Sequence, residues 1–121
     1  RRRIAALYDR ALRDIEGITV LTHPQGALPT YNQYTVLVGE GRRDELAEHL
    51  RERGIATAVY YPVPLHRMEA FRGRAKAHGG LGHSEKACAQ VLSLPVDPLL
   101  EPGEAESVTT AVMEWASKKG G

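Results

Sequence analysis

The segment YTVLV at residues 34–38 is a nearly continuous apolar run that is followed at once by the turn sequence GEG. Such a run is typical of a strand that is covered on both faces, or on one face and along an edge. We therefore predict that it is the central strand of a sheet with helices packed against it. The 42% of hydrophobic residues can fill one core, so residues 1–121 are expected to form a single domain.

Two helices and a short strand are predicted on either side of this central strand. The first helix, which Gly17 ends, carries apolar residues at helical spacing: Ile4, Leu7, Tyr8, Ala11, Leu12 and Ile15. Residues 18–24, ITVLTHP, resemble a short strand, and residues 25–32 resemble a turn. Residues 43–53 place Leu46 and Leu50 on one side and predict a surface helix.

A third strand is predicted over residues 55–61, IATAVYY, because two prolines follow it and neither can donate to a ladder. Residues 68–83 contain four glycines and are expected to form a loop. Ser84 is the predicted N-cap of a helix over residues 85–92, and an extended piece follows over residues 93–98.

The last predicted helix starts at Pro102 and turns four apolar residues inward: Val108, Ala111, Val112 and Trp115. The order of all these elements predicts an α+β fold, a two-layer sandwich in which helices pack on a small sheet of three to four strands. The helix between the second and third strands allows a parallel crossover, so a mixed and an antiparallel sheet both remain open.

The charge and cysteine content exclude several classes of function. Sixteen basic and fifteen acidic residues leave a net charge of +1, and no basic residues interleave with aromatics, so no nucleic-acid partner is expected. The opening RRR is interpreted as a solvated helix start. The single cysteine, Cys88, fits a reducing cytoplasm, and no apolar stretch approaches the roughly 20 residues of a membrane span.

Two weak motifs near residue 80 are interpreted as structural. Imidazole, carboxylate and thiolate groups all bind zinc, and four such residues are close in sequence: His78, His83, Glu85 and Cys88. Three intervening glycines spoil the spacing, so a loop with a buried cysteine is the preferred interpretation and no metal is predicted. The HGGLGHS segment lacks the lysine of a phosphate-binding loop, and we interpret it as a turn.

The strongest candidates for a binding site are polar-tipped side chains at predicted strand ends, where ligand groups collect. They are Asn32, Tyr60, Tyr61 and His66, with Tyr34 beside them. Two adjacent tyrosines alone would more often place one ring inward and the other on the surface. However, prolines on both sides of Val63 fix the backbone and hence the direction of His66, which an ordinary loop does not need.

Three segments carry a resemblance to a known family: YNQYTVLV, RRDELAEHLRERGIATAVYYPVPLHRMEAF and SEKACAQVLSLPVDPLL. In order and spacing they resemble the C-terminal domain of the DegT/StrS family of pyridoxal-phosphate-dependent nucleotide-sugar aminotransferases. The resemblance implies the small domain of a fold type I aminotransferase, which moves an amino group, usually from glutamate, to a keto group of a nucleotide-linked sugar. Members of the family are typically homodimers.

The resemblance also implies that catalysis needs a large domain that residues 1–121 do not contain. In this family a lysine of the large domain forms the Schiff base with pyridoxal phosphate. The lysines of this chain are Lys76, Lys86, Lys118 and Lys119, and none lies in that sequence context. We therefore expect the chain alone to be inactive, with the cofactor bound by the large domain.

Substrate contact is carried over from the family to Tyr60, Tyr61 and His66, and Asn32 is inferred to lie near the donor carboxylate or the cofactor. The chain departs from the family where Leu37 replaces a frequent arginine, and where Arg67 and Met68 follow PLH. These departures leave donor and sugar preference open.

The alternative function is an autonomous, non-catalytic binding or regulatory module derived from the family. The apolar face of the first helix argues against it, because one small sheet is not expected to cover that face.

Overall fold

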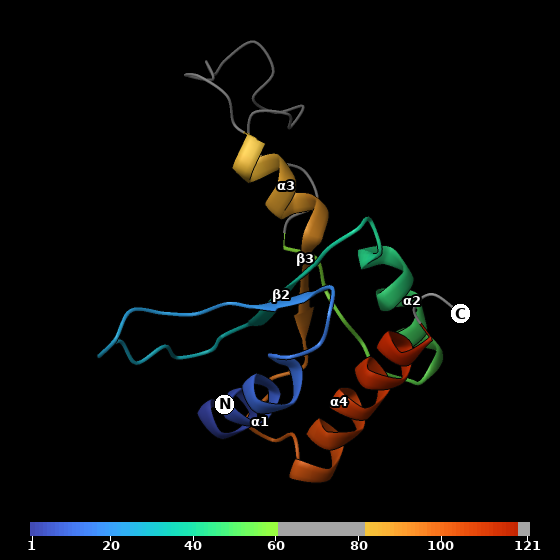
Figure 1. The fold of residues 1–121 in the computed structure, drawn as a ribbon. Helices are drawn as coiled ribbons and strands as arrows, with labels where there is room; N and C mark the ends of the chain where they lie inside the picture. Colours follow the sequence, from blue (N-terminus) through green and yellow to red (C-terminus); the bar gives the residue numbers. More distant parts are fainter. Residues whose placement is uncertain (61–81, 119–121) are drawn as a thin grey trace, which may run out of the picture.

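The computed structural model describes residues 1–60 and 82–118. Its elements are, in chain order, α1 (Arg2–Leu12), β1 (Ile18–Val20), β2 (Tyr34–Val38), α2 (Arg43–Glu52), α3 (Gly82–Gln90), β3 (Val91–Leu94) and α4 (Pro102–Ser117). Figure 1 shows the strands at the centre, with α1, α2 and α4 gathered beside them and α3 leading into β3. No helix within these described ranges is both long and apolar enough to cross a membrane.

The three described strands form one antiparallel sheet in the order β1-β2-β3. The prediction that residues 34–38 form the central strand is confirmed, since Val36 lies opposite Val20 on one side and Leu92 on the other. Of the two sheet types left open by the sequence, the antiparallel one is found, and the α+β class is confirmed.

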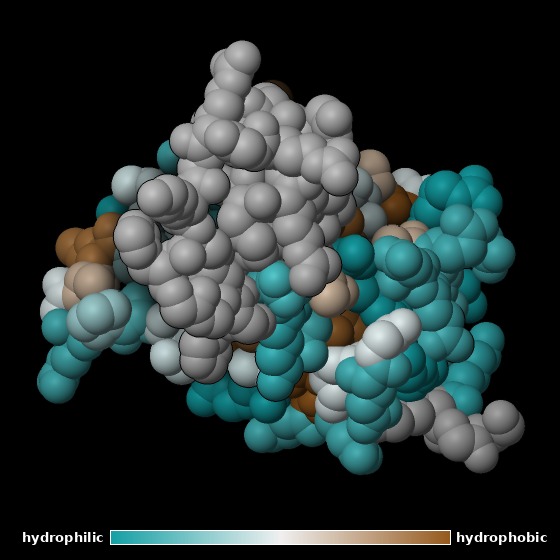
Figure 2. All heavy atoms as spheres, turned by 90° about the horizontal axis from the view of Figure 1, so that it is seen from above, coloured by the Kyte–Doolittle hydropathy of each residue, from teal (hydrophilic) through white to brown (hydrophobic). Residues whose placement is uncertain are grey.

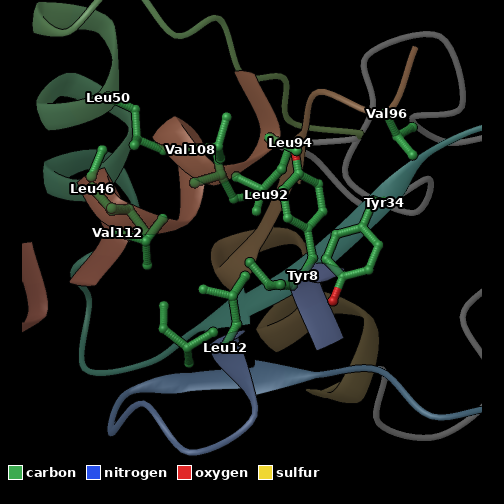
Figure 3. Packing of buried hydrophobic residues seen from close by; sticks show 14 of the residues in the cluster. Tyr8, Leu12, Tyr34, Leu46, Leu50, Leu92, Leu94, Val96, Val108 and Val112 are labelled. Carbon is green, nitrogen blue, oxygen red and sulfur yellow. The ribbon is translucent and has the colours of Figure 1, made fainter. Parts of the chain in front are cut away.

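The core lies between this sheet and the helices α1, α2 and α4. Burial alternates along β2, where Tyr34, Val36 and Val38 are buried and the residues between them are half-buried. Figure 3 shows how the side chains of β2 and β3 meet those of the three helices in one cluster. Alternation of this kind is what a strand packed on one face produces.

Helix α1 is covered more completely than its sequence suggests. Its residues Ile4, Ala5, Tyr8 and Leu12 are buried, because α4 as well as the sheet packs against them. The helix ends at Leu12, and Ile15 is half-buried beyond it. The expectation that the apolar face of this helix would stay uncovered is therefore wrong, and it no longer argues against an autonomous module.

Helix α4 begins at Pro102, as predicted, and is capped at its first turn. Glu101 and Glu104 form a reciprocal capping box, which satisfies backbone N–H groups that the first turn of a helix leaves free. Near its other end Trp115 is buried, and the guanidinium carbon of Arg42, the residue that precedes α2, lies 4.2 Å from the centre of the indole ring. The α4 helix therefore joins α1 and α2 into one layer.

The prediction of a regular third strand over residues 55–61 is wrong for residues 55–60, where only Ala58 forms an isolated bridge, to Ser93. The strand that pairs with β2 on the side opposite β1 is β3. The first residues of β3 were predicted from the sequence to be helical. In β3 Val91 pairs with Leu37 and Leu92 with Val36. Pairing with β2 therefore makes these two residues part of a strand, although their spacing in the sequence would also continue the helix.

The neighbouring predictions also need correction at their ends. Helix α3 starts at Gly82 and ends at Gln90, so it includes the last two residues of the expected loop. Cys88 within it is half-buried. Strand β1 is shorter than predicted because residues 21–33 leave the sheet as an extended arm, seen on the left of Figure 1. The arm carries exposed Leu21 and Leu28, and Figure 2 shows brown, hydrophobic atoms on that side and a mostly hydrophilic surface over α2.

Candidate functional site

A pocket of about 400 Å³ opens at the end of the sheet where β2 begins and β3 ends. Because the two strands are antiparallel, the residues before β2 and the residues after β3 must meet at this end. The pocket is lined by Arg1, residues 32–33, residues 56–58, Tyr60 and residues 93–97. We call it the sheet-end pocket, and its size is that of a site for a small molecule.

Two of the four predicted binding residues, Asn32 and Tyr60, line the sheet-end pocket. They are 28 positions apart in sequence, and each lies beside a strand end or bridge: Asn32 precedes β2, and Tyr60 follows the Ala58 bridge to β3. Both are exposed. The other two, Tyr61 and His66, lie outside the described residues.

The position of Asn32 is set by a strained residue and a hydrogen bond. Tyr31 has φ of 53°, a left-handed conformation that residues with side chains adopt rarely and at a cost. Its ring lies 6.1 Å, centre to centre, from that of Tyr34. Arg1 donates from Nη1 to Oδ1 of Asn32 at 3.2 Å, and Arg2 donates to the carbonyl of Pro29 at the same distance. The first turn of α1 thus holds the segment that enters β2.

The opposite wall, residues 93–97, is held from three sides. The hydroxyl groups of Thr35 and Ser93 are 2.8 Å apart across the β2–β3 pair. Tyr8 of α1 donates from its hydroxyl to the carbonyl of Pro95 at 2.6 Å. Asp97 accepts the backbone N–H of Leu99 at 2.7 Å, closing a short turn before α4.

The buried tyrosines beside the pocket are hydrogen-bond donors rather than candidate proton-transfer groups. Burial raises the pKa of Tyr8 well above its usual value. Burial, and then the hydrogen bond that its hydroxyl donates to Oδ1 of Asp9 at 2.7 Å, raise the pKa of Tyr34 likewise. Both phenols therefore keep their protons near neutral pH.

Sequence reasoning did not identify several lining residues. Arg1 was interpreted only as part of a solvated helix start, and residues 93–97 only as an extended piece. Gln33 and Thr57 were not singled out. The available signal was the pairing of 34–38 with 91–94, since an antiparallel register places residue 95 beside residue 33. Periodicity within one segment does not carry that information.

The part of the chain that the structure describes can be compared with the metal hypothesis and with the positions of its lysines. Among the described side chains, those of residues 1–60 and 85–118, no three His, Cys, Asp or Glu groups come together as a metal ion requires. His78 of the metal hypothesis lies outside these ranges. Of the two described lysines, Lys86 is in α3 and Lys118 follows α4, and neither lines the sheet-end pocket.

A second hollow, of about 640 Å³, follows the outer edge of β1 and is lined by Asp9, Arg13 and residues 18–23. It contains none of the predicted binding residues, so the sheet-end pocket remains the candidate site.

Comparison with known proteins assigns the chain to a protein family. A model of the DegT/DnrJ/EryC1/StrS aminotransferase family matches residues 1–113. The chain is 41% identical over 115 residues to a dTDP-3-amino-3,4,6-trideoxy-alpha-D-glucose transaminase of Streptomyces venezuelae, covering 95% of this chain and 30% of that protein. It is 38% identical to the pleiotropic regulatory protein of Geobacillus stearothermophilus, covering 95% of this chain and 31% of that protein.

Solved structures give the same result for the fold. The crystal structure of S. venezuelae DesV, in complex with a ketimine intermediate, matches with a TM-score of 0.89 and 40% identity. The match covers 97% of this chain and 31% of DesV. The chain thus spans about a third of the length of the proteins that it matches.

Proposed function

The chain belongs to the DegT/DnrJ/EryC1/StrS aminotransferase family, and we propose that it forms the substrate side of a pyridoxal-phosphate-dependent sugar aminotransferase. The proposed reaction moves an amino group from an amino acid, with glutamate as the proposed donor, to a keto group of a nucleotide-linked sugar. The observation that carries the proposal is the sheet-end pocket, in which Asn32 and Tyr60 come together. The similarity to a dTDP-sugar transaminase supports the substrate class.

The groups that line the pocket suit a sugar. Tyr60, Thr57 and Ser93 bring hydroxyl groups, and Asn32 and Gln33 bring amides. Groups of these two kinds both donate and accept hydrogen bonds, as the hydroxyl groups of a hexose require. We propose that Tyr61 and His66 contact the same substrate.

We propose that the lysine that anchors the cofactor in this family lies outside residues 1–121; neither described lysine, Lys86 or Lys118, lines the pocket, which supports this. Pyridoxal phosphate supplies the electron sink for amino transfer when it is bound. We therefore place the cofactor on a large domain outside residues 1–121, with this chain as the C-terminal small domain and the full-length protein as a homodimer. The proposed compartment is the cytoplasm, which suits a chain with one cysteine and no internal disulfide.

A non-catalytic binding or regulatory module is the second candidate function. One observation favours it: a relative 38% identical to this chain carries the name of a regulatory protein. The well-covered α1 is also compatible with a domain that folds by itself.

The two candidates differ in what the natural gene product does. We would read the complete coding frame, purify its product, and assay glutamate-dependent amination of a dTDP-linked keto sugar. Turnover is expected. A natural product that begins near Arg1 and neither binds pyridoxal phosphate stoichiometrically nor transfers an amino group would favour the regulatory module.

The proposed role of His66 is tested in the same assay. We expect His66→Ala in the full-length enzyme to raise the KM for the nucleotide sugar and to leave the cofactor absorbance unchanged. A variant with wild-type KM and kcat would remove His66 from the site.

A further inference from the structure

The hydrogen bond between Arg1 and Asn32 determines which end of the Asn32 amide faces Arg1. A guanidinium group has five N–H donors and no acceptor, so the atom of Asn32 that faces Arg1 must be the carbonyl oxygen Oδ1. The amide nitrogen Nδ2 is therefore turned away from Arg1. Asn32 lines the sheet-end pocket, and its two N–H groups are not engaged by the contact with Arg1.

Arg1 adds to the same side of the pocket. It also lines the pocket, and only its Nη1 is used in the contact with Asn32, so further guanidinium N–H groups remain at the pocket wall. Asp97 is the single acidic residue among the described residues of the lining, and its Oδ1 accepts the N–H of Leu99. The Arg1–Asn32 side therefore presents a positive charge and several donors.

Tyr31 explains why this arrangement is held in place. Its left-handed φ of 53° costs free energy, and its ring lies beside that of buried Tyr34, which is hydrogen-bonded to Asp9 of α1. A strained backbone next to a pocket residue is a common sign that the direction of that residue matters. Asn32 is thus fixed on one side by Tyr31 and on the other by Arg1.

We propose that Arg1 and Asn32 form an anion subsite within the sheet-end pocket. Its ligand is a phosphate or carboxylate oxygen, which would accept charge-assisted hydrogen bonds from the guanidinium and a hydrogen bond from the amide N–H. The inference rests on the proposed function, in which such an anion is either the diphosphate of the nucleotide sugar or the carboxylate of the amino donor.

The decisive variant is Asn32→Asp in the full-length enzyme. The new carboxylate keeps a strong contact with Arg1 but turns negative charge and acceptors toward the pocket. An anion subsite then predicts a rise of about tenfold or more in the KM of one substrate, with an unchanged or higher unfolding midpoint. If Asn32 only braces the loop, the variant keeps the wild-type KM for both substrates, and the inference is wrong.

The contribution of the positive charge of Arg1 is tested by comparison with variants of Arg2. Arg1→Gln should raise the same KM. Arg1→Lys should raise it less, because lysine keeps the positive charge but lacks the planar guanidinium group with its fixed N–H donors. The matched control is Arg2→Gln, which removes one exposed arginine of the same turn that does not line the pocket. Equal effects of Arg1→Gln and Arg2→Gln would overturn the subsite in favour of general surface charge.

Two further measurements identify which substrate the subsite binds and test anion binding without turnover. A rise in KM for the nucleotide sugar assigns the subsite to the diphosphate, and a rise for glutamate assigns it to the carboxylate. Calorimetric titration of the same full-length proteins with inorganic pyrophosphate and with glutarate, a dicarboxylate that has no amino group to transfer, does not need turnover. Absence of anion binding, or equal binding by wild type and Asn32→Asp, overturns the subsite, whereas a wild type that binds anions but transfers no amino group overturns only the proposed function.

Discussion

Three buried aromatic residues do much of the packing between helices and sheet. Tyr8, Tyr34 and Trp115 are all less than 5% exposed. The rings of Tyr8 and Tyr34 meet edge to face with their centres 4.9 Å apart, and each hydroxyl finds an acceptor, Pro95 or Asp9. Residues of this size contribute large buried areas with few rotatable bonds, so single changes among them are expected to be costly.

Trp115→Ala should lower the free energy of unfolding by about 3 to 5 kcal/mol, because a cavity would open between α4 and the side chain of Arg42. Urea unfolding of the isolated chain measures the change. The control is Met113→Ala on the same helix, which is 44% exposed and should cost about 0.5 kcal/mol. Equal shifts for the two variants would show that Trp115 is not a core residue in solution.

The stability of the domain should fall as the pH rises above about 10, the pKa of tyrosine in an unfolded chain. The pKa values of Tyr8 and Tyr34 are raised by burial in the folded state, so only the unfolded chain releases these protons at that pH. Proton release then favours unfolding, by up to about 1.4 kcal/mol per pH unit for each group. The stabilising effect is complete below pH 10.

Unfolding free energies between pH 8 and 11, with tyrosinate absorbance followed in parallel, test this dependence. Tyr8→Phe and Tyr34→Phe should each flatten the alkaline decline. A slope that neither substitution changes would mean that other groups cause it.

At the scale of elements, the sequence predicted the central strand β2 correctly but did not predict β3, the strand that pairs with one of its edges. YTVLV is buried whatever its partners, so its pattern predicted β2 correctly. Residues 55–61 and 91–94 both have strand-forming sequences, and which of them lies next to β2 depends on long-range pairing. In the structure β3 pairs with β2, and Ala58 forms a single bridge to Ser93 on the opposite edge of β3.

The residues of the candidate site also divide into those that the sequence predicted and those that it did not. Asn32 and Tyr60 were predicted because residues beside strand ends can be recognised locally, and both line the pocket. Arg1 and Asp97 were missed because their place there depends on the β2–β3 register and on the Tyr8–Pro95 hydrogen bond. The resemblance to the family indicated the substrate class, but it did not indicate these contacts.

The junction of α3 and β3 depends on one arginine of α2. Arg43 donates from Nη1 to the carbonyls of Cys88 and Val91, each at 3.0 Å, and its side chain is only 12% exposed. Carbonyl groups at a helix end lack partners within the helix, so this side chain caps α3 from outside.

Arg43→Met should therefore destabilise the chain by about 1 to 3 kcal/mol and speed amide hydrogen exchange in α3 more than in α4. The matched control is Arg51→Met, which removes an exposed pair with Glu48 on the same helix and should cost at most about 0.5 kcal/mol. Uniform acceleration of exchange across all helices in Arg43→Met would argue against a local cap.

For the whole molecule, the proposal that the cofactor lies on another domain makes a simple prediction. The chain of residues 1–121, purified alone, should fold cooperatively and should transfer no amino group from glutamate to a dTDP-linked keto sugar in the presence of pyridoxal phosphate. The full-length protein is the positive control. Turnover by the short chain would mean that these residues contain a complete active site.

The packing of α4 against α1 also sets the order of events while the protein is being made. Within residues 1–121, Tyr8 and Leu12 are synthesised about a hundred residues before the α4 side chains that cover them, among them Val108 and Val112. The nascent domain therefore carries an exposed apolar helix and an unfinished sheet until β3 and α4 have been synthesised. Holding chaperones have their longest access to this domain during that interval, and its folding is completed only after α4 has emerged.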